Sequence, residues 1–222
     1  MAATSPADIH QGTARKDGAL AILIAAERLF GLHGLDGVTI RQITLAAGMA
    51  NNSAVAYHFG SKDGLLRAIC EWRNPQLEAA GEGIWRNAER EGRLDDPATL
   101  IGVLLRPFLA VTDPDGKHSH AAFMYQMLRS PVGRAIRVSL FDISISTAKA
   151  LDRLYSVLPE VPPELLRYRL RILGAAFFDG IGEWDLGVTD PAYPAMPLGQ
   201  LVDELIGMVV AACAAPPGAI RS

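Results

Sequence analysis

The feature that most constrains this chain is a pair of short helical segments, joined by a tight turn, between residues 39 and 59. Thr39 and Gln42 have the spacing of a capping box, so a helix is expected to begin at Thr39. That helix reaches a turn at Gly48, and a second short helix is predicted over residues 51–57. Two short helices around a glycine-containing turn are typical of a helix-turn-helix unit, whose second helix enters the major groove of DNA.

Longer helices are predicted on both sides of this pair. Apolar residues recur at helical spacing over residues 16–33, and Gly34 is placed to end that helix. Ser61 is placed to cap a long helix that would run to about residue 90. Because Pro75 falls in its middle, we expect a kink or a break there.

The remainder of the chain also has helical periodicity, and alternating strand patterns are nearly absent. Turn-forming sequences separate the apolar segments. Further helices are predicted over residues 97–112, 118–129, 132–157, 163–184 and 198–214. The sequence therefore predicts an all-α fold of about nine helices.

Composition sets wide limits on function. Half of the 222 residues are hydrophobic and the net charge is -3, which is typical of a soluble globular chain. Residues 1–73 carry a net charge of +1 and the rest a net charge of -4. The sign suits a DNA-binding front and an acidic rear, but so weak a contrast would not indicate nucleic acid by itself.

No apolar run approaches the roughly 20 residues that span a bilayer, and the polar start lacks the apolar core of a secretory signal. We therefore expect a cytoplasmic protein without a membrane partner. Cys70 and Cys213 lie far apart and lack metal-ligand spacing, so both are interpreted as small buried hydrophobic residues. No bound metal and no cofactor are predicted.

The second helix of the pair has hydrogen-bonding side chains at its start, where such helices face the base edges. Asn can bind adenine through two hydrogen bonds, and Ser can donate to or accept from several bases. Asn51, Asn52 and Ser53 are thus candidates for reading bases. The same run also fits an ordinary helix start with an Asx cap, and both interpretations stay open.

The segment TIRQITLAAGMANNSAVAYHFGSKDGLLRAI, residues 39–69, resembles the DNA-binding domain of the TetR family of transcription regulators. The shared features are a Thr-capped helix, an Ala-Gly turn, a short helix ending in Tyr-His-Phe, and Ser-Lys-x-x-Leu opening the next helix. The resemblance covers about residues 16–73. It implies a flexible arm over residues 1–15, a helix-turn-helix domain over residues 16–60, and a helical effector-binding and dimerisation domain over residues 61–222.

The resemblance also implies roles for individual DNA-binding residues. Phosphate contacts are expected from Thr39, Arg41 and Lys62. One or both of Tyr57 and His58 would touch the DNA backbone, although Tyr57 also suits partial core packing and Lys62 an ordinary solvated charge. Phe59 would pack inside.

This chain departs from the family at one point. It has ten residues between Gly48 and Phe59, where the family's common pattern has nine. The extra residue lies around residues 49–52. It leaves open which residue faces the bases among Asn51, Asn52, Ser53 and Ala54.

For the rear of the chain, the resemblance implies that the last two helices pair with those of a second copy in a four-helix bundle. An intramolecular core is the alternative for each residue. The expected interface residues are Leu166, Leu170, Leu173, Phe177, Ile181, Leu201, Leu205 and Val209.

An effector pocket is expected between the middle helices, with apolar walls and a few polar contacts. Aromatic and methionine residues there also suit an ordinary core. The candidate wall residues are Trp85, Phe108, Phe123, Met127, Asp142, Tyr155 and Phe178. His118 and His120 are too close for a good helical metal pair and are interpreted as lying in the loop before a helix.

The predicted function is a ligand-responsive repressor that binds a palindromic, double-stranded DNA operator as a homodimer and is released by a small apolar or amphipathic effector. The alternative is a helix-turn-helix dimer that activates transcription or acts through protein contacts without an effector. The chain has no phosphate-binding loop, dinucleotide fingerprint, metalloprotease motif or nucleophile elbow, so it is not predicted to be an enzyme.

Overall fold

The computed structural model describes residues 6–139, 144–187 and 196–218, and within these ranges it contains helices and no strand. The expected all-α fold is confirmed, with ten α-helices and one 3-10 helix in place of about nine. The helices are α1 (Pro6–His33), α2 (Ile40–Ala46), α3 (Ser53–Phe59), α4 (Lys62–Arg90), α5 (Pro97–Leu105), η1 (Arg106–Ala110), α6 (Ser119–Arg129), α7 (Pro131–Ser139), α8 (Ile145–Val157), α9 (Pro163–Leu186) and α10 (Leu198–Ala214). Across the described ranges, no helix has the length and apolar character needed to cross a membrane.

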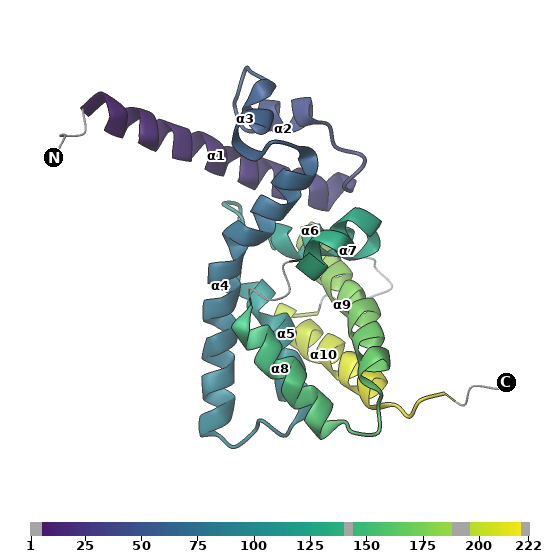
Figure 1. The fold of residues 1–222 in the computed structure, drawn as a ribbon. Helices are drawn as coiled ribbons and strands as arrows, with labels where there is room; N and C mark the ends of the chain where they lie inside the picture. Colours follow the sequence, from purple (N-terminus) through teal and green to yellow (C-terminus); the bar gives the residue numbers. More distant parts are fainter. Residues whose placement is uncertain (1–5, 140–143, 188–195, 219–222) are drawn as a thin grey trace.

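The helices form two regions, which we call the head and the body. The head consists of α1, α2, α3 and the first turns of α4, and Figure 1 shows them together at one end of the molecule. The body consists of the rest of α4 and the helices from α5 to α10. Helix α1 packs both on α2 and α4 within the head and on α6 of the body, so α1 joins the two regions.

Helix α1 begins at Pro6, ahead of the start predicted at about residue 16. Residues 6–15, expected as part of a flexible arm, are therefore helical. Proline is well suited to the first position of a helix because its missing N–H would have no partner there. The sequence offers no second proline to interrupt the helix before His33.

Helix α4 continues through Pro75, so the predicted break is absent. Pro75 cannot donate a hydrogen bond to the carbonyl of Glu71. Both residues lie on the exposed side of α4, where water can reach the freed carbonyl. The buried side chains of Leu66 and Arg73 hold the helix against its neighbours.

Two other predicted helices are divided in the structure. The segment 97–112 is α5 followed by η1, because Pro107 cannot continue the α-helical hydrogen-bonding pattern. The segment 132–157 is two helices, and Ser144 begins the second by accepting a hydrogen bond from the backbone N–H of Thr147 at 3.4 Å.

Buried apolar side chains form one contiguous core from the head into the body. In the head it includes Phe30 of α1, Ile43 of α2 and Val55 of α3. In the body it includes Phe123 and Met127, both fully buried. The two regions are thus packed as one unit, and a change in the body can reach the head through shared contacts.

Candidate DNA-binding surface and effector cavity

Helix α2 begins as the sequence predicts. The backbone N–H of Gln42 donates to Thr39 Oγ1 at 3.3 Å, and the backbone N–H of Thr39 donates to Gln42 Oε1 at 2.8 Å. These two bonds form the capping box. Arg41 is exposed beside them.

The turn after α2 depends on Gly48, whose φ is +72°, a backbone conformation that favours glycine. The backbone N–H of Met49 donates to the carbonyl of Thr44 at 2.8 Å and closes the turn. The chain then runs outside helix until Ser53. The extra residue is therefore accommodated before α3, and the helix itself stays short.

Asn51 and Asn52 both help to build this turn. Asn51 Oδ1 accepts from the backbone N–H of Ser53 at 2.9 Å, as an Asx cap does. Asn52 Oδ1 accepts from the hydroxyl of buried Thr44 at 2.9 Å. The side-chain oxygens of both residues are thus used within the protein, which favours the interpretation as a helix start over base reading. Their side-chain amide N–H groups can still donate to a base.

One face of α3 points outward. Ser53, Ala56 and Tyr57 are exposed, and their spacing of three and four residues places them on the same side of the helix. Val55 is buried, and Ala54 is half-buried against the core, which turns it away from this face. Ala56 was missed in the sequence, although its spacing from Ser53 would have indicated it.

The junction of α3 and α4 is tight. A Cβ on Gly64 would lie 2.0 Å from the carbonyl oxygen of Phe59, so only glycine fits there. Lys62 donates from Nζ to the carbonyl of Val38 at 2.8 Å and lies 5.5 Å from the centre of the Phe30 ring. Lys62 therefore holds the head together, and its phosphate contact stays a prediction. His58 and Phe59 are both half-buried beside this junction.

Some of the positive charges counted in the front of the chain point toward the body and not toward the outer surface of the head. Arg28 pairs with Asp113 at 3.4 Å and with Asp115 at 2.8 Å, both in the loop of the body between η1 and α6. Arg73 is buried and pairs with Glu27. Counting cations along the sequence therefore overstates the charge available to DNA, because two of them point toward the body.

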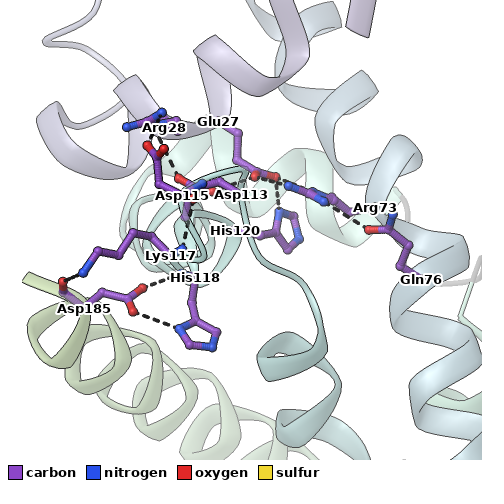
Figure 2. A network of polar contacts seen from close by, with 11 residues as sticks. Glu27, Arg28, Arg73, Gln76, Asp113, Asp115, Lys117, His118, His120 and Asp185 are labelled. Carbon is purple, nitrogen blue, oxygen red and sulfur yellow. Dashed lines mark hydrogen bonds and ion pairs between the residues drawn. The ribbon is translucent and has the colours of Figure 1, made fainter. Parts of the chain in front are cut away.

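A buried polar cluster, the Glu27 cluster, joins α1 to the body. It consists of Glu27, Arg73, Ser119 and His120, and Figure 2 shows Arg73 and His120 converging on Glu27. Arg73 donates to both carboxylate oxygens of Glu27, at 2.9 and 2.6 Å. The hydroxyl of Ser119 and Nδ1 of His120 each lie 2.9 Å from them. Because an ionised carboxylate only accepts, Nδ1 of His120 must carry the hydrogen.

The charge of Glu27 is well compensated. Burial alone raises its pKa, but the hydrogen bonds from Arg73 and His120 outweigh burial and lower the pKa to about 2. Glu27 is therefore ionised at neutral pH although its side chain is fully buried. Removing it would leave a buried guanidinium without its counter-charge.

His118 lies directly before α6, as expected, whereas His120 lies within the first turn of α6, and both side chains are buried. Nδ1 of His118 lies 3.0 Å from the carboxylate of Asp185 on α9. His120 contacts Glu27 on α1. These partners are distant in the sequence, and no local pattern indicates them.

A cavity of about 120 Å³ lies beside the Glu27 cluster, among α4, α5, η1, α6, α7 and α8. His120 belongs to the cluster and also lines the cavity. A larger hollow of about 290 Å³ lies between α1, α6 and α9. Among the described residues, no group of three or more His, Cys, Asp and Glu side chains could hold a metal ion.

The predicted wall residues are scattered. Phe108 lines the smaller cavity and Phe178 the larger hollow. Phe123 and Met127 belong to the core, and neither Trp85 nor Tyr155 lines either space. Asp142 lies outside the described residues. Spacing identified apolar side chains but could not show which of them border a cavity.

Cys70 and Cys213 are free thiols. Cys213 is buried as expected, whereas Cys70 is half-buried and lines the smaller cavity. Burial raises the pKa of the Cys70 thiol to about 12 and that of Cys213 to about 11. Both thiols are therefore protonated at neutral pH and poor nucleophiles.

The predicted dimer residues divide into two groups. Four are buried in the core of the single chain: Leu166, Phe177, Ile181 and Val209. Four are partly exposed: Leu170, Leu173, Leu201 and Leu205. The large apolar side chains exposed on the same two helices include Tyr168, Ile172 and Met208, which the sequence pattern did not single out.

Residues 22–69 match the family described as bacterial regulatory proteins, tetR family. No curated protein matches the chain. Among solved structures, the chain is similar to that of a TetR family transcriptional regulator, PfmR, from Thermus thermophilus. The two are 21% identical over 86% of this chain and 96% of that one, with a TM-score of 0.46. The family match runs from within α1 into α4, and so it includes the capped α2, the Gly48 turn and the outward face of α3.

Proposed function

We propose that this chain, a DNA-binding transcription regulator of the tetR family, is a cytoplasmic homodimeric repressor that binds a palindromic operator and is released by a small effector. The observation that carries the proposal is the family match over residues 22–69, together with the exposure of Ser53, Ala56 and Tyr57 on α3. Such a helix presents these side chains to base edges and backbone in the major groove.

Backbone contacts are assigned to the residues around α3. Thr39 and Arg41 are exposed at the start of α2, where a phosphate would meet them. Lys62 and His58 are less accessible to a phosphate, since both are half-buried. Because so few cations face outward, one head would bind weakly, and two heads in a dimer double the phosphate contacts.

The DNA-binding test begins with selection of genomic fragments by the purified full-length protein, followed by titration of a selected fragment over a range of salt concentrations. Arg41→Ala is expected to weaken binding to all fragments and to reduce the salt slope by about 2, because the dimer loses one phosphate contact from each of its two heads. Arg86→Ala is the matched control, since Arg86 is an exposed arginine near the far end of α4. Equal affinities and slopes for Arg41→Ala and the wild type would contradict the assignment.

For the dimer we assign the exposed apolar side chains of α9 and α10, centred on Tyr168, Ile172 and Met208. If these side chains packed against those of a second copy, their apolar surface would be removed from water. Ile172→Asp should turn a dimer into a monomer in sedimentation velocity and abolish tight operator binding. A dimer that persists in this variant would move the interface elsewhere.

The effector response is assigned to the cavity beside the Glu27 cluster. Cavity residues Cys70, Asn74 and Leu77 come from α4, the same helix that carries Arg73. An occupant would contact both α4, which carries Arg73, and His120, and these provide two of the three links to Glu27 on α1; Ser119 is the third. It can release DNA only if it binds more tightly to the arrangement of heads that does not fit the operator.

A promoter–reporter assay with the selected fragment separates repression from the other possibilities. Deletion of the regulator should raise expression from the selected promoter. A fall in expression would indicate an activator instead. Binding that responds to no small molecule would favour a dimer that acts through protein contacts.

A further inference from the structure

Arg137 on α7 is a cation in an unusual position. It lines the cavity of about 120 Å³, where burial lowers its pKa. A guanidinium nevertheless stays protonated in proteins, because its ordinary pKa is so high. The cavity is therefore lined by a permanent positive charge on a half-buried side chain.

Arg137 has no counter-charge in the described part of the chain. No residue there forms a hydrogen bond or an ion pair with its guanidinium. Glu78 does not line the cavity, and its carboxylate accepts hydrogen bonds from Ser144 at 2.9 Å and from Ser146 at 2.9 and 3.0 Å, both of which do. Among the described residues, no fully buried side-chain nitrogen or oxygen lacks a hydrogen-bond partner. The unpartnered nitrogens of Arg137 are therefore not fully enclosed, and they are accessible from the cavity that Arg137 lines.

The rest of the cavity suits a small amphipathic molecule. Its polar lining includes Asn74 and Thr147, which can donate or accept hydrogen bonds. Its apolar lining is Leu77, Val103, Leu104, Pro107, Phe108 and Met124. The volume is close to that of an engineered cavity of about 150 Å³ that takes up benzene, so one ring or a short chain would fit.

We propose that this cavity binds a small carboxylic acid, with its carboxylate paired to Arg137 and its apolar part against Phe108 and the neighbouring aliphatic side chains. The inference rests on the proposed function, in which this cavity receives the effector. A single cation matches a singly charged anion, and a guanidinium pairs with a carboxylate through two parallel hydrogen bonds. Arg137 is half-buried and has no ionic partner among the described residues, so a carboxylate that pairs with it supplies binding energy that a neutral ligand cannot.

The test uses benzoate and benzamide, which have the same shape and differ in charge, with the full-length protein in isothermal titration calorimetry. The wild type is expected to bind benzoate at least tenfold more tightly than benzamide. Arg137→Met should lose this preference. Arg86→Met, which removes an exposed arginine far from the cavity, should keep it. Equal binding of the two probes by the wild type, binding of neither, or a preference that survives in Arg137→Met would overturn the proposal.

Thermal unfolding of the ligand-free proteins gives an independent reading. Because methionine fills similar space and removes a half-buried charge that has no ionic partner in the described part of the chain, Arg137→Met should unfold at a higher temperature than the wild type. A lower unfolding temperature would show that the guanidinium already has a partner, and would overturn the proposal.

Operator binding distinguishes this inference from the function on which it rests. If benzoate binds with the expected preference but leaves operator affinity unchanged, the anion site stands and the effector response fails. If benzamide releases the operator as well as benzoate does, the effector response stands and the carboxylate assignment fails.

Discussion

The head and the Glu27 cluster use polar side chains in opposite ways. In the head, Thr39 bonds to Gln42 and Ser61 bonds to Gly64, each over three residues and in exposed positions. In the cluster, Glu27 bonds to Arg73 across 46 residues and to His120 across 93, with all three side chains buried. Local bonds shape the surface offered to DNA, whereas long-range bonds connect that surface to the body.

This difference predicts a difference in energy. An exposed helix cap contributes about 1 kcal/mol, because water competes for its hydrogen bonds. Removal of one partner from a buried charge cluster costs about 3 to 5 kcal/mol, because the remaining charge stays buried and unpaired. Substitutions in the two regions should therefore separate by size and by their dependence on pH.

The largest effect is expected for Glu27→Ala. It leaves Arg73 buried without its counter-charge and should lower the free energy of unfolding by about 3 to 5 kcal/mol. Urea unfolding followed by circular dichroism measures the change. Glu82→Ala is the control, since Glu82 pairs with Lys149 at the surface and should cost less than about 1 kcal/mol. Similar losses in the two variants would show that the cluster is no stronger than a surface pair.

The next largest effect is on acid stability. Because the pKa of Glu27 is lowered from 4.5 to about 2 in the folded protein, its ionised form stabilises the fold. That contribution is fully present above pH 4.5 and is lost as the pH falls toward 2. The loss should amount to about 3 kcal/mol. Unfolding measured from pH 6 to pH 2 should show it in the wild type and not in Glu27→Gln, and identical pH profiles would contradict the assignment.

A smaller effect is expected for the head. Thr39→Ala removes the side-chain acceptor for the backbone N–H of Gln42 and should lower the free energy of unfolding by about 1 kcal/mol. Thr39→Ser keeps the acceptor and is the matched control. The same urea measurement applies, and a loss as large as that of Glu27→Ala would erase the contrast between the two regions.

The same contrast explains what could be predicted from the sequence. The capping box, the Gly48 turn and the Ser61 cap depend on residues close together in the chain, so their spacing was sufficient. The partners of Glu27 and His118 depend on how α1, α6 and α9 pack, and spacing carries no information about that. Asp185 shows the limit, since it pairs with His118 across 67 residues.

The apolar patterns of α9 and α10 have a related limit. Spacing showed that Phe177 and Ile181 lie on one side of a helix, but not whether that side meets the chain's own core or a second copy. Both are fully buried within the single chain. Ile172 and Met208 are exposed instead, and only the packing of the neighbouring helices decides which face remains uncovered.

The most direct test of the account is the affinity of Tyr57→Ala for a selected operator fragment, measured by fluorescence anisotropy. The wild type should bind at least tenfold more tightly than this variant, while their unfolding curves coincide, because Tyr57 is 64% exposed on the outward face of α3. Ile145→Ala is the control, as Ile145 is 62% exposed at the start of α8 in the body, and it should bind as the wild type does. Equal operator affinities for Tyr57→Ala and the wild type would contradict the assignment of α3 as the DNA-reading helix.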